Sequence, residues 1–312
     1  MEPGALLRVA REAAGITLRA MAERTFYSAG YLSLIENGQR RAPAGVATAY
    51  ERVLGTTDLG RLSTAARSAS SADAGTLSEV ATMLGALRRI EDATGSLAVL
   101  PAVRGMSAMV SEFAREARAA HDDAVTLAAE VTQYRGWLEH AIGADTAARR
   151  SMATAVDLAT ESGDPNRLVH SLVFAGVVTW SATGSYAEVI DLSDAALDVR
   201  GAHPVLIAYA AMRRAELLAT RGQTAASRAA LSTADDAIEA ATGAEPPPEA
   251  MYWWTPGFGA VQRGGVLTLL GDTAQAIEEA TAGLAEMPPE HRRTEWLAST
   301  LRKIDPEMTG DD

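Results

Sequence analysis

Apolar residues recur at helical spacing along almost the whole chain. Between residues 76 and 303, alanine- and leucine-rich segments of roughly 14–20 residues alternate with glycines and prolines that interrupt a helix. The strict alternation of apolar and polar residues that is typical of strands is missing. The pattern predicts an all-α fold, with breaks at Gly95, Gly143, 163–164, Gly184, Gly201, Gly222, 243–248, Gly271 and 288–289.

Four of the predicted turns, at Gly143, Gly184, Gly222 and Gly271, lie 41, 38 and 49 residues apart. Similar helices follow them: TAARRSMATAVDLA, SYAEVIDLSDAALD, TAASRAALSTADDAI and DTAQAIEEATAGLA. Small residues at helix contacts let paired helices approach closely, and neighbouring hairpins bury each other's apolar faces. The segment resembles tetratricopeptide repeats, whose usual period is about 34 residues. Because the spacing is longer and uneven, we expect tetratricopeptide-like repeats; an unrelated helical bundle is the alternative.

Residues 4–54 read as four short helices. The first ends at Gly15, Thr17 caps the second, Ser28 caps the third, and the fourth ends at Gly55. The stretch that follows is rich in small residues and reads as a linker with a short helix around 59–67. The predicted parts are an N-terminal domain at 1–55, a linker at 56–75, a helical-repeat domain at 76–305 and a disordered tail at 306–312.

The segment ITLRAMAERTFYSAGYLSLIENGQRR resembles the helix-turn-helix of the Cro/repressor, or xenobiotic response element, family. The small Ala22 suits a close helix crossing, and Leu32 and Ile35 are expected in the core. Many members have glutamine at the first position of the second helix, where this chain has Leu18. The resemblance covers about 50 residues. It implies that the third helix enters the major groove of DNA.

The predicted recognition helix carries few groups that make paired hydrogen bonds to bases. The base-facing positions correspond to Ala29, Gly30, Ser33 and Leu34, and the ring face of Tyr31 can touch thymine methyl groups. More groups are available for phosphate contacts, from Asn37, Gln39, Arg40 and Arg41. We therefore expect binding through phosphates, methyl contacts and DNA shape. The alternative is a helix-turn-helix that contacts protein only, with Arg40 and Arg41 exposed to solvent and without a partner. The predicted DNA-binding residues are Thr17, Ser28, Ala29, Gly30, Tyr31, Ser33, Leu34, Asn37, Gln39, Arg40 and Arg41.

Charge is divided unevenly along the chain. The net charge is -12, yet residues 1–55 hold seven arginines and five glutamates, which leaves +2 in the head and -14 in the remainder. There is no cysteine, no signal-peptide core and no run of about 18 apolar residues. We therefore expect a cytoplasmic protein with no membrane span, whose mildly basic head contacts double-stranded DNA.

A helix-turn-helix head on a helical-repeat body resembles repeat-containing regulators of actinobacteria and, more loosely, peptide-sensing regulators of Gram-positive bacteria. The resemblance implies that the body dimerises or holds an effector. Peptide sensors use asparagines, of which this chain has two, so a small amphipathic molecule or a protein partner is favoured over a peptide. For the aromatic residues the alternative is core packing, and for Arg213 a solvated pair with Arg214. The candidate ligand-binding residues are Trp180, Tyr209, Arg213, Tyr252, Trp253 and Trp254.

Sequence motifs that are typical of catalytic or metal-binding sites are weak in this chain. His121-Asp122-Asp123 and Glu139-His140 lack a second histidine at the spacing of a metal site, and phosphate-binding loops are absent. We expect no enzyme activity, metal or cofactor. The sequence as a whole predicts a homodimeric, DNA-binding transcriptional regulator; a protein-interaction scaffold or anti-regulator without DNA binding is the alternative.

Overall fold

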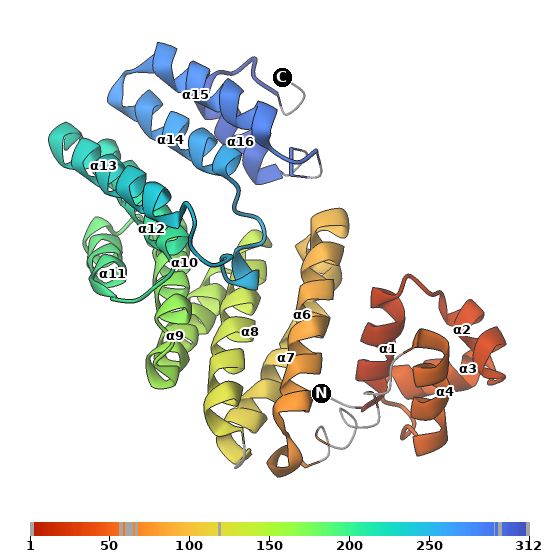
Figure 1. The fold of residues 1–312 in the computed structure, drawn as a ribbon. Coiled ribbons are helices and arrows are strands. Elements are labelled where there is room, and N and C mark those ends of the chain that lie inside the picture. Colours follow the sequence, from red (N-terminus) through yellow and green to blue (C-terminus); the bar gives the residue numbers. More distant parts are fainter. Residues whose placement is uncertain are drawn as a thin grey trace. The chain divides into compact units, whose positions relative to one another are not determined.

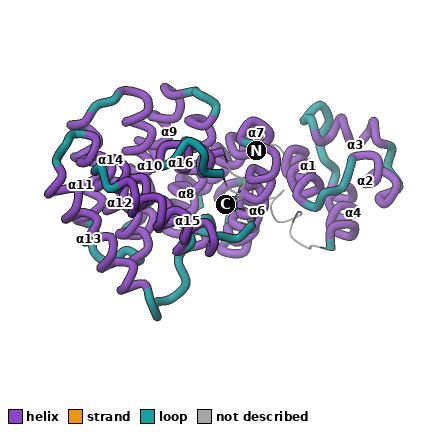
Figure 2. The backbone as a smooth tube through the Cα atoms, turned by 90° about the horizontal axis from the view of Figure 1, so that it is seen from above, coloured by secondary structure: helices purple, strands orange, loops and turns teal. Residues whose placement is uncertain are grey.

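The computed structural model describes residues 3–55, 59, 65, 68–117, 120–289, 291–292 and 295–309 (Figure 1). Within these ranges there are fifteen α-helices, two 3₁₀ turns and no strand. The described parts of the tube in Figure 2 are coloured as helix or loop. The predicted all-α fold is therefore confirmed. By contacts the chain divides into two compact units, Met1–Asp164 and Pro165–Asp312.

The first unit begins with the four helices expected from the sequence. The hydroxyl of Thr17 accepts a hydrogen bond from the Ala20 amide, and that of Ser28 accepts one from the Tyr31 amide. Both predicted N-caps are thus confirmed, because each side chain satisfies an amide that has no partner inside its helix. The helices are α1 (Pro3–Ala13), α2 (Leu18–Thr25), α3 (Ala29–Glu36) and α4 (Ala44–Leu54).

The rest of the first unit consists of long helices that pack in sequence order. Gly95 alone separates α6 from α7, and its φ of 82° reverses the chain in a way that a side chain would oppose. One hydrophobic core contains side chains from the four N-terminal helices and from α6, α7 and α8. These helices are α6 (Ala74–Thr94), α7 (Ser96–Glu116), α8 (His121–Ala141) and α9 (Asp145–Ser162).

The second unit is built from helical hairpins. Helices α10 and α11, α12 and α13, and α14 and α15 pack as pairs, and α16 packs on the last pair. These pairs are a repeat-like arrangement, whereas their tetratricopeptide type stays a prediction. The helices are α10 (Pro165–Thr183), α11 (Tyr186–Asp198), α12 (Pro204–Thr220), α13 (Thr224–Ala241), α14 (Pro256–Leu270), α15 (Thr273–Glu286) and α16 (Glu295–Ile304).

Three predicted boundaries fall partly outside the described residues. Residues 56–58, 60–64 and 66–67 belong there, which include half of the predicted linker and most of the short helix around 59–67. The rest of the linker contains a 3₁₀ turn at Ala69–Ser71 and the start of α6. Of the predicted tail, residues 306–309 follow α16 and Met308 is buried, while 310–312 are not described. The division into two units does not test whether residues 1–55 fold alone, so the domain bounds stay predictions.

Among the described helices, α7 is the one that is long and apolar enough to cross a membrane by length and composition. Half of its apolar window is buried within the protein. Val103, Met106 and Val110 of this helix belong to the core of the first unit. Helix α7 is therefore weak evidence for a membrane span.

Candidate nucleic-acid interface

Helix α3 has one face in the core of the head and one face in solvent. Leu32 and Ile35 are fully buried, together with Met21 of α2. Their predicted core positions are confirmed. On the opposite face Gly30 is exposed, and Leu34 keeps 41% of its surface accessible although it is apolar. The predicted base-facing side of α3 is thus open to another molecule.

The exposed Gly30 is not required by the fold. It lies in the first turn of α3, and an added Cβ atom would meet nothing within 4 Å. Glycine inside a helix is less favourable than alanine by about 1 kcal/mol. Since neither packing nor backbone conformation demands it, the glycine leaves room for another molecule to approach the backbone of α3.

Arg40 lies over α3, although it follows the helix in sequence. Its amide donates to the Leu34 carbonyl at 3.0 Å, and its guanidinium carbon lies 4.9 Å from the centroid of the Tyr31 ring. Tyr31 in turn stacks on Tyr27, with centroids 5.5 Å apart. The half-buried Tyr31 is thus a platform for a cation, a cation–π contact that leaves the edge of the guanidinium open to phosphate.

The turn after α3 presents further polar groups. Asn37, a predicted phosphate contact, donates from Nδ2 to the hydroxyl of Ser33, a predicted base-facing residue, at 3.2 Å. Gln39 and Arg41 are exposed. Within the described part of the chain, neither Arg40 nor Arg41 has an acidic partner, whereas Arg8, Arg11 and Arg19 do. The two arginines beside α3 are therefore available to phosphate.

A buried ion pair fixes the end of α3. Glu36 accepts from Arg11 Nε at 2.8 Å and Nη2 at 2.7 Å, and from the Tyr50 hydroxyl at 2.7 Å. The hydrogen bond to Glu36 raises the pKa of Arg11, and burial raises the pKa of Tyr50 well above its ordinary value. These contacts join α1, α3 and α4, so they hold the predicted recognition helix in place.

The structure brings most of the predicted DNA-binding residues into one segment. The residues from Ser28 to Arg41 lie on α3 and the turn after it, while Thr17 caps α2 at some distance along the chain. Leu18 is half-buried and packs on the core. Sequence reasoning missed the platform formed by Tyr31 and the buried role of Glu36; an acidic residue inside an apolar helix was the available signal for the latter.

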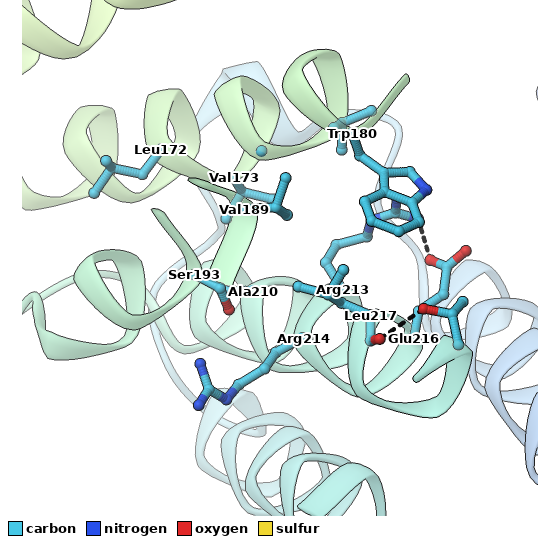
Figure 3. Close-up of a pocket in the computed structure, with 13 residues that line it drawn as sticks. Leu172, Val173, Trp180, Val189, Ser193, Ala210, Arg213, Arg214, Glu216 and Leu217 are labelled. Carbon is cyan, nitrogen blue, oxygen red and sulfur yellow. Dashed lines mark hydrogen bonds and ion pairs between the residues drawn. The ribbon is translucent and has the colours of Figure 1, made fainter. Parts of the chain in front are cut away.

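The candidate ligand-binding residues fall in two places of the second unit. Trp180 of α10 and Arg213 of α12 line a pocket between α10, α11 and α12 (Figure 3). Tyr209 is 8% exposed and packs against Trp253, with ring centroids 5.1 Å apart, and against Trp254 at 5.9 Å. Burial raises the pKa of the Tyr209 hydroxyl.

The cluster around Tyr209 has the character of a core. Phe174 and Phe258 complete it and are nearly buried, and Tyr252 beside it is half-buried. This packing favours the core alternative for Tyr209, Trp253 and Trp254. Their part in ligand binding stays a prediction that the pocket itself does not support.

The two acidic-histidine stretches remain apart from any metal-binding geometry. His121 lies 4.0 Å from Glu161, and His140 lies 3.8 Å from Asp145. Among the described residues no group of three histidine, aspartate or glutamate side chains is placed to hold a metal ion.

Comparison with known proteins places this geometry in a family of domains. A family model described as a helix-turn-helix domain matches residues 3–62, which include α1 to α4. No curated protein and no solved structure matches the chain. The N-terminal segment is a helix-turn-helix domain, and this supports a DNA-binding regulator.

Proposed function

We propose that the protein is a sequence-specific, DNA-binding transcriptional regulator that acts in the cytoplasm. The observation that carries the proposal is the match of residues 3–62 to a helix-turn-helix domain. The third helix of this head has an exposed face beside Arg40 and Arg41, which have no acidic partner among the residues that the structure describes. In this proposal α2 and α3 form the helix-turn-helix motif, and α3, the second helix of that motif, enters the major groove.

The contacts divide into phosphate positioning and base contact. Arg40, Arg41, Asn37 and Gln39 surround the end of α3 and supply donors to phosphate. The base-facing groups are fewer, and Ser33 is the principal polar one. The ring of Tyr31 packs against the guanidinium of Arg40. We therefore expect Tyr31 to position that arginine and not to contact a thymine methyl group. Binding then depends on charge and DNA shape more than on direct readout.

Such a head gains specificity when two copies bind together. Isolated phosphate contacts give mostly nonspecific affinity, whereas two heads on half-sites one helical turn apart add their base contacts. We therefore propose a homodimer formed through the helical body, with an effector that changes the geometry of the heads. Light scattering at micromolar concentration tests the dimer, and a monomeric mass would contradict it.

The test of DNA binding is recovery of genomic DNA fragments by the full-length protein, followed by titration of an enriched fragment at several salt concentrations. The Arg40→Ala/Arg41→Ala variant should bind more weakly and lower the slope of log K against log salt by about 2 per head. The matched control is Arg149→Ala/Arg150→Ala, an adjacent and exposed pair on α9 outside the head. It should leave the slope unchanged.

The outcomes separate the proposal from its alternative. A paired half-site that depends on Arg40 and Arg41 supports the regulator. An equal loss in both double variants would mean that net charge alone drives binding. Failure of the wild-type protein to enrich any fragment would favour the alternative function, a protein-interaction module. The exposed ring of Phe26, on the surface of the head, is the observation that favours that alternative.

A further inference from the structure

A pocket in the second unit lies where α10, α11 and α12 meet (Figure 3). Its walls are mainly apolar and include Leu172, Val177, Val189 and Leu217. The cavity volume is about 50 Å³, within about 530 Å³ of empty space that includes the open mouth. At roughly 10–15 Å³ for each water-sized group, a volume of about 50 Å³ holds about four heavy atoms. A small branched or linear hydrocarbon chain fits this size.

One wall residue is a glycine that the fold does not require. Gly176 lies inside α10 and is buried, and an added Cβ atom would meet only Val189, at an ordinary distance of 3.7 Å. Its backbone is helical, so alanine would suit the helix better. The glycine therefore keeps space open in the pocket.

A second wall residue has an unsatisfied polar atom. The Ser193 hydroxyl on α11 is shielded from solvent and has no hydrogen-bond partner within the described structure. An unpaired buried hydroxyl is unfavourable unless another molecule pairs with it. The pocket thus offers a hydrogen-bonding position to an oxygen atom carried by a ligand.

Charged groups stand at the same pocket. Arg213 pairs with Glu216 through Nη1, and Arg214 pairs with Asp194 through Nη1. Arg213 and Arg214 are each mostly buried, with 29% and 24% of the side chain exposed. A guanidinium has five N–H donors, and each arginine uses one nitrogen on its acidic partner. Donors remain for a carboxylate, for which arginine is well shaped.

We propose that this pocket binds a short-chain aliphatic carboxylate of about four to six carbons, with the hydrocarbon among the apolar walls and the carboxylate at Arg213. Acids that also carry a hydroxyl or oxo oxygen bind more tightly, because that oxygen reaches Ser193. The binding site rests on the pocket alone. Its role as an effector site rests on the proposed function.

The test is isothermal titration of the full-length protein, without DNA, with butyrate, isovalerate, hexanoate, 3-hydroxybutyrate and the corresponding amides. We expect at least one acid to bind with a Kd between about 10 µM and 1 mM, a range suited to so small a ligand. The amides should bind at least tenfold more weakly, since they lack the charge. Because DNA is absent, failure here leaves the DNA-binding proposal intact.

Substitutions at three residues locate the site. Gly176→Leu should abolish binding. If that variant does not fold, Gly176→Ala is the second test: it adds one methyl group, suits a helix and should weaken hexanoate binding. Arg213→Gln should weaken every acid about tenfold. Ser193→Ala should remove the advantage of 3-hydroxybutyrate over butyrate. The control is Gly265→Ala on α14, a helical glycine that does not line the pocket.

Three results would overturn the proposal. The first is that no acid binds with a Kd below about 5 mM, because weaker binding than this is not expected of a specific pocket of this size. The second is that amides bind as tightly as acids, which would mean that the pocket does not recognise the carboxylate. The third is that folded Gly176 variants and Arg213→Gln bind like the wild-type protein, which would place the ligand elsewhere.

Discussion

Phe26, in the turn between α2 and α3, has a backbone conformation that bulky residues avoid. Its φ is 61°, and among the described residues it is the one non-glycine residue with a positive φ. The left-handed conformation costs an ordinary residue about 1–2 kcal/mol relative to the right-handed one. The ring is 90% exposed, so packing does not offset that cost. A strained and exposed aromatic residue beside α3 points to a role outside the stability of the head.

We expect Phe26→Gly to raise the free energy of unfolding by about 1 kcal/mol, because glycine adopts this conformation without strain. Urea unfolding followed by circular dichroism measures the change. The matched control is Arg24→Gly, two residues earlier inside α2, which should lower stability by about 1 kcal/mol. A less stable Phe26→Gly variant would show that the ring makes a stabilising contact.

At the scale of residues, the sequence predicts what depends on near neighbours. Thr17 and Ser28 reach amides three residues away, so residue type and position suffice to predict the caps. The position of Arg40 over Tyr31 depends on the turn after α3, whose path brings a later residue back onto the helix. The strain at Phe26 also belongs to a turn. Neither is encoded in a local pattern.

Between elements, the buried carboxylate of Glu36 joins α3 to α1 and α4. We expect Glu36→Gln to lower the free energy of unfolding by about 3–5 kcal/mol, because the charge of Arg11 then stays buried without its counter-ion. Chemical denaturation measures this. The control is Glu23→Gln on α2, whose exposed pair with Arg19 at 3.9 Å should contribute less than about 0.5 kcal/mol. Equal effects would mean that the buried pair contributes no more than a surface pair.

Two adjacent glycines on α14 allow a test of close helix packing. An added Cβ atom at Gly264 would lie 2.8 Å from the Ala276 carbonyl oxygen of α15, whereas at Gly265 it would meet Thr300 at 3.8 Å. We expect Gly264→Ala to lower stability by about 1–3 kcal/mol, since a backbone atom must move. Gly265→Ala should be neutral or stabilising by up to about 1 kcal/mol. Thermal unfolding compares them, and similar melting temperatures would contradict the close contact.

The helices and their ends were largely predictable, because glycines mark them. The predicted breakers at Gly143, Gly184, Gly222 and Gly271 all have positive φ, which side chains oppose. What glycine inside a helix means is less evident from sequence. Gly264 marks a close approach of two helices, Gly176 has room for a side-chain methyl group in ordinary contact with Val189, and Gly30 faces open space. Only the packing distinguishes these cases.

At the scale of the whole molecule, the sequence predicts an acidic body but does not predict which of its acidic side chains are buried and stabilise the fold through their charge. Glu139 joins three helices of the first unit: it accepts from Arg104 of α7 and Arg135 of α8, each at 3.1 Å, and from Ser151 of α9 at 2.7 Å. Its side chain is fully buried. The sequence drew attention to it only as a neighbour of His140, because the three donors lie far apart or on separate turns.

Acid should therefore weaken the first unit through Glu139. Burial alone raises the pKa of this carboxyl, but the hydrogen bonds from Ser151, Arg135 and Arg104 outweigh it and hold the pKa below the ordinary value of 4.5. A lowered folded pKa stabilises the protein above the unfolded pKa, and that contribution is lost as the pH falls through the folded pKa. We expect Glu139→Gln to be less stable than the wild-type protein by about 2 kcal/mol at pH 7.

The difference in unfolding free energy between the two proteins should narrow as the pH falls below about 4.5, because the unfolded wild-type chain then binds a proton that the folded carboxylate binds only at lower pH. Urea unfolding at pH 7, 5, 4 and 3 measures it. The comparison must be made as a difference, because burial raises the pKa of Glu91 and gives that group the opposite dependence in both proteins. The control is Glu112→Gln, an exposed partner of Arg115 on α7, for which the difference should stay near zero at every pH. A gap for Glu139→Gln that is constant with pH would mean that the carboxylate stabilises the unit by shape and not by charge.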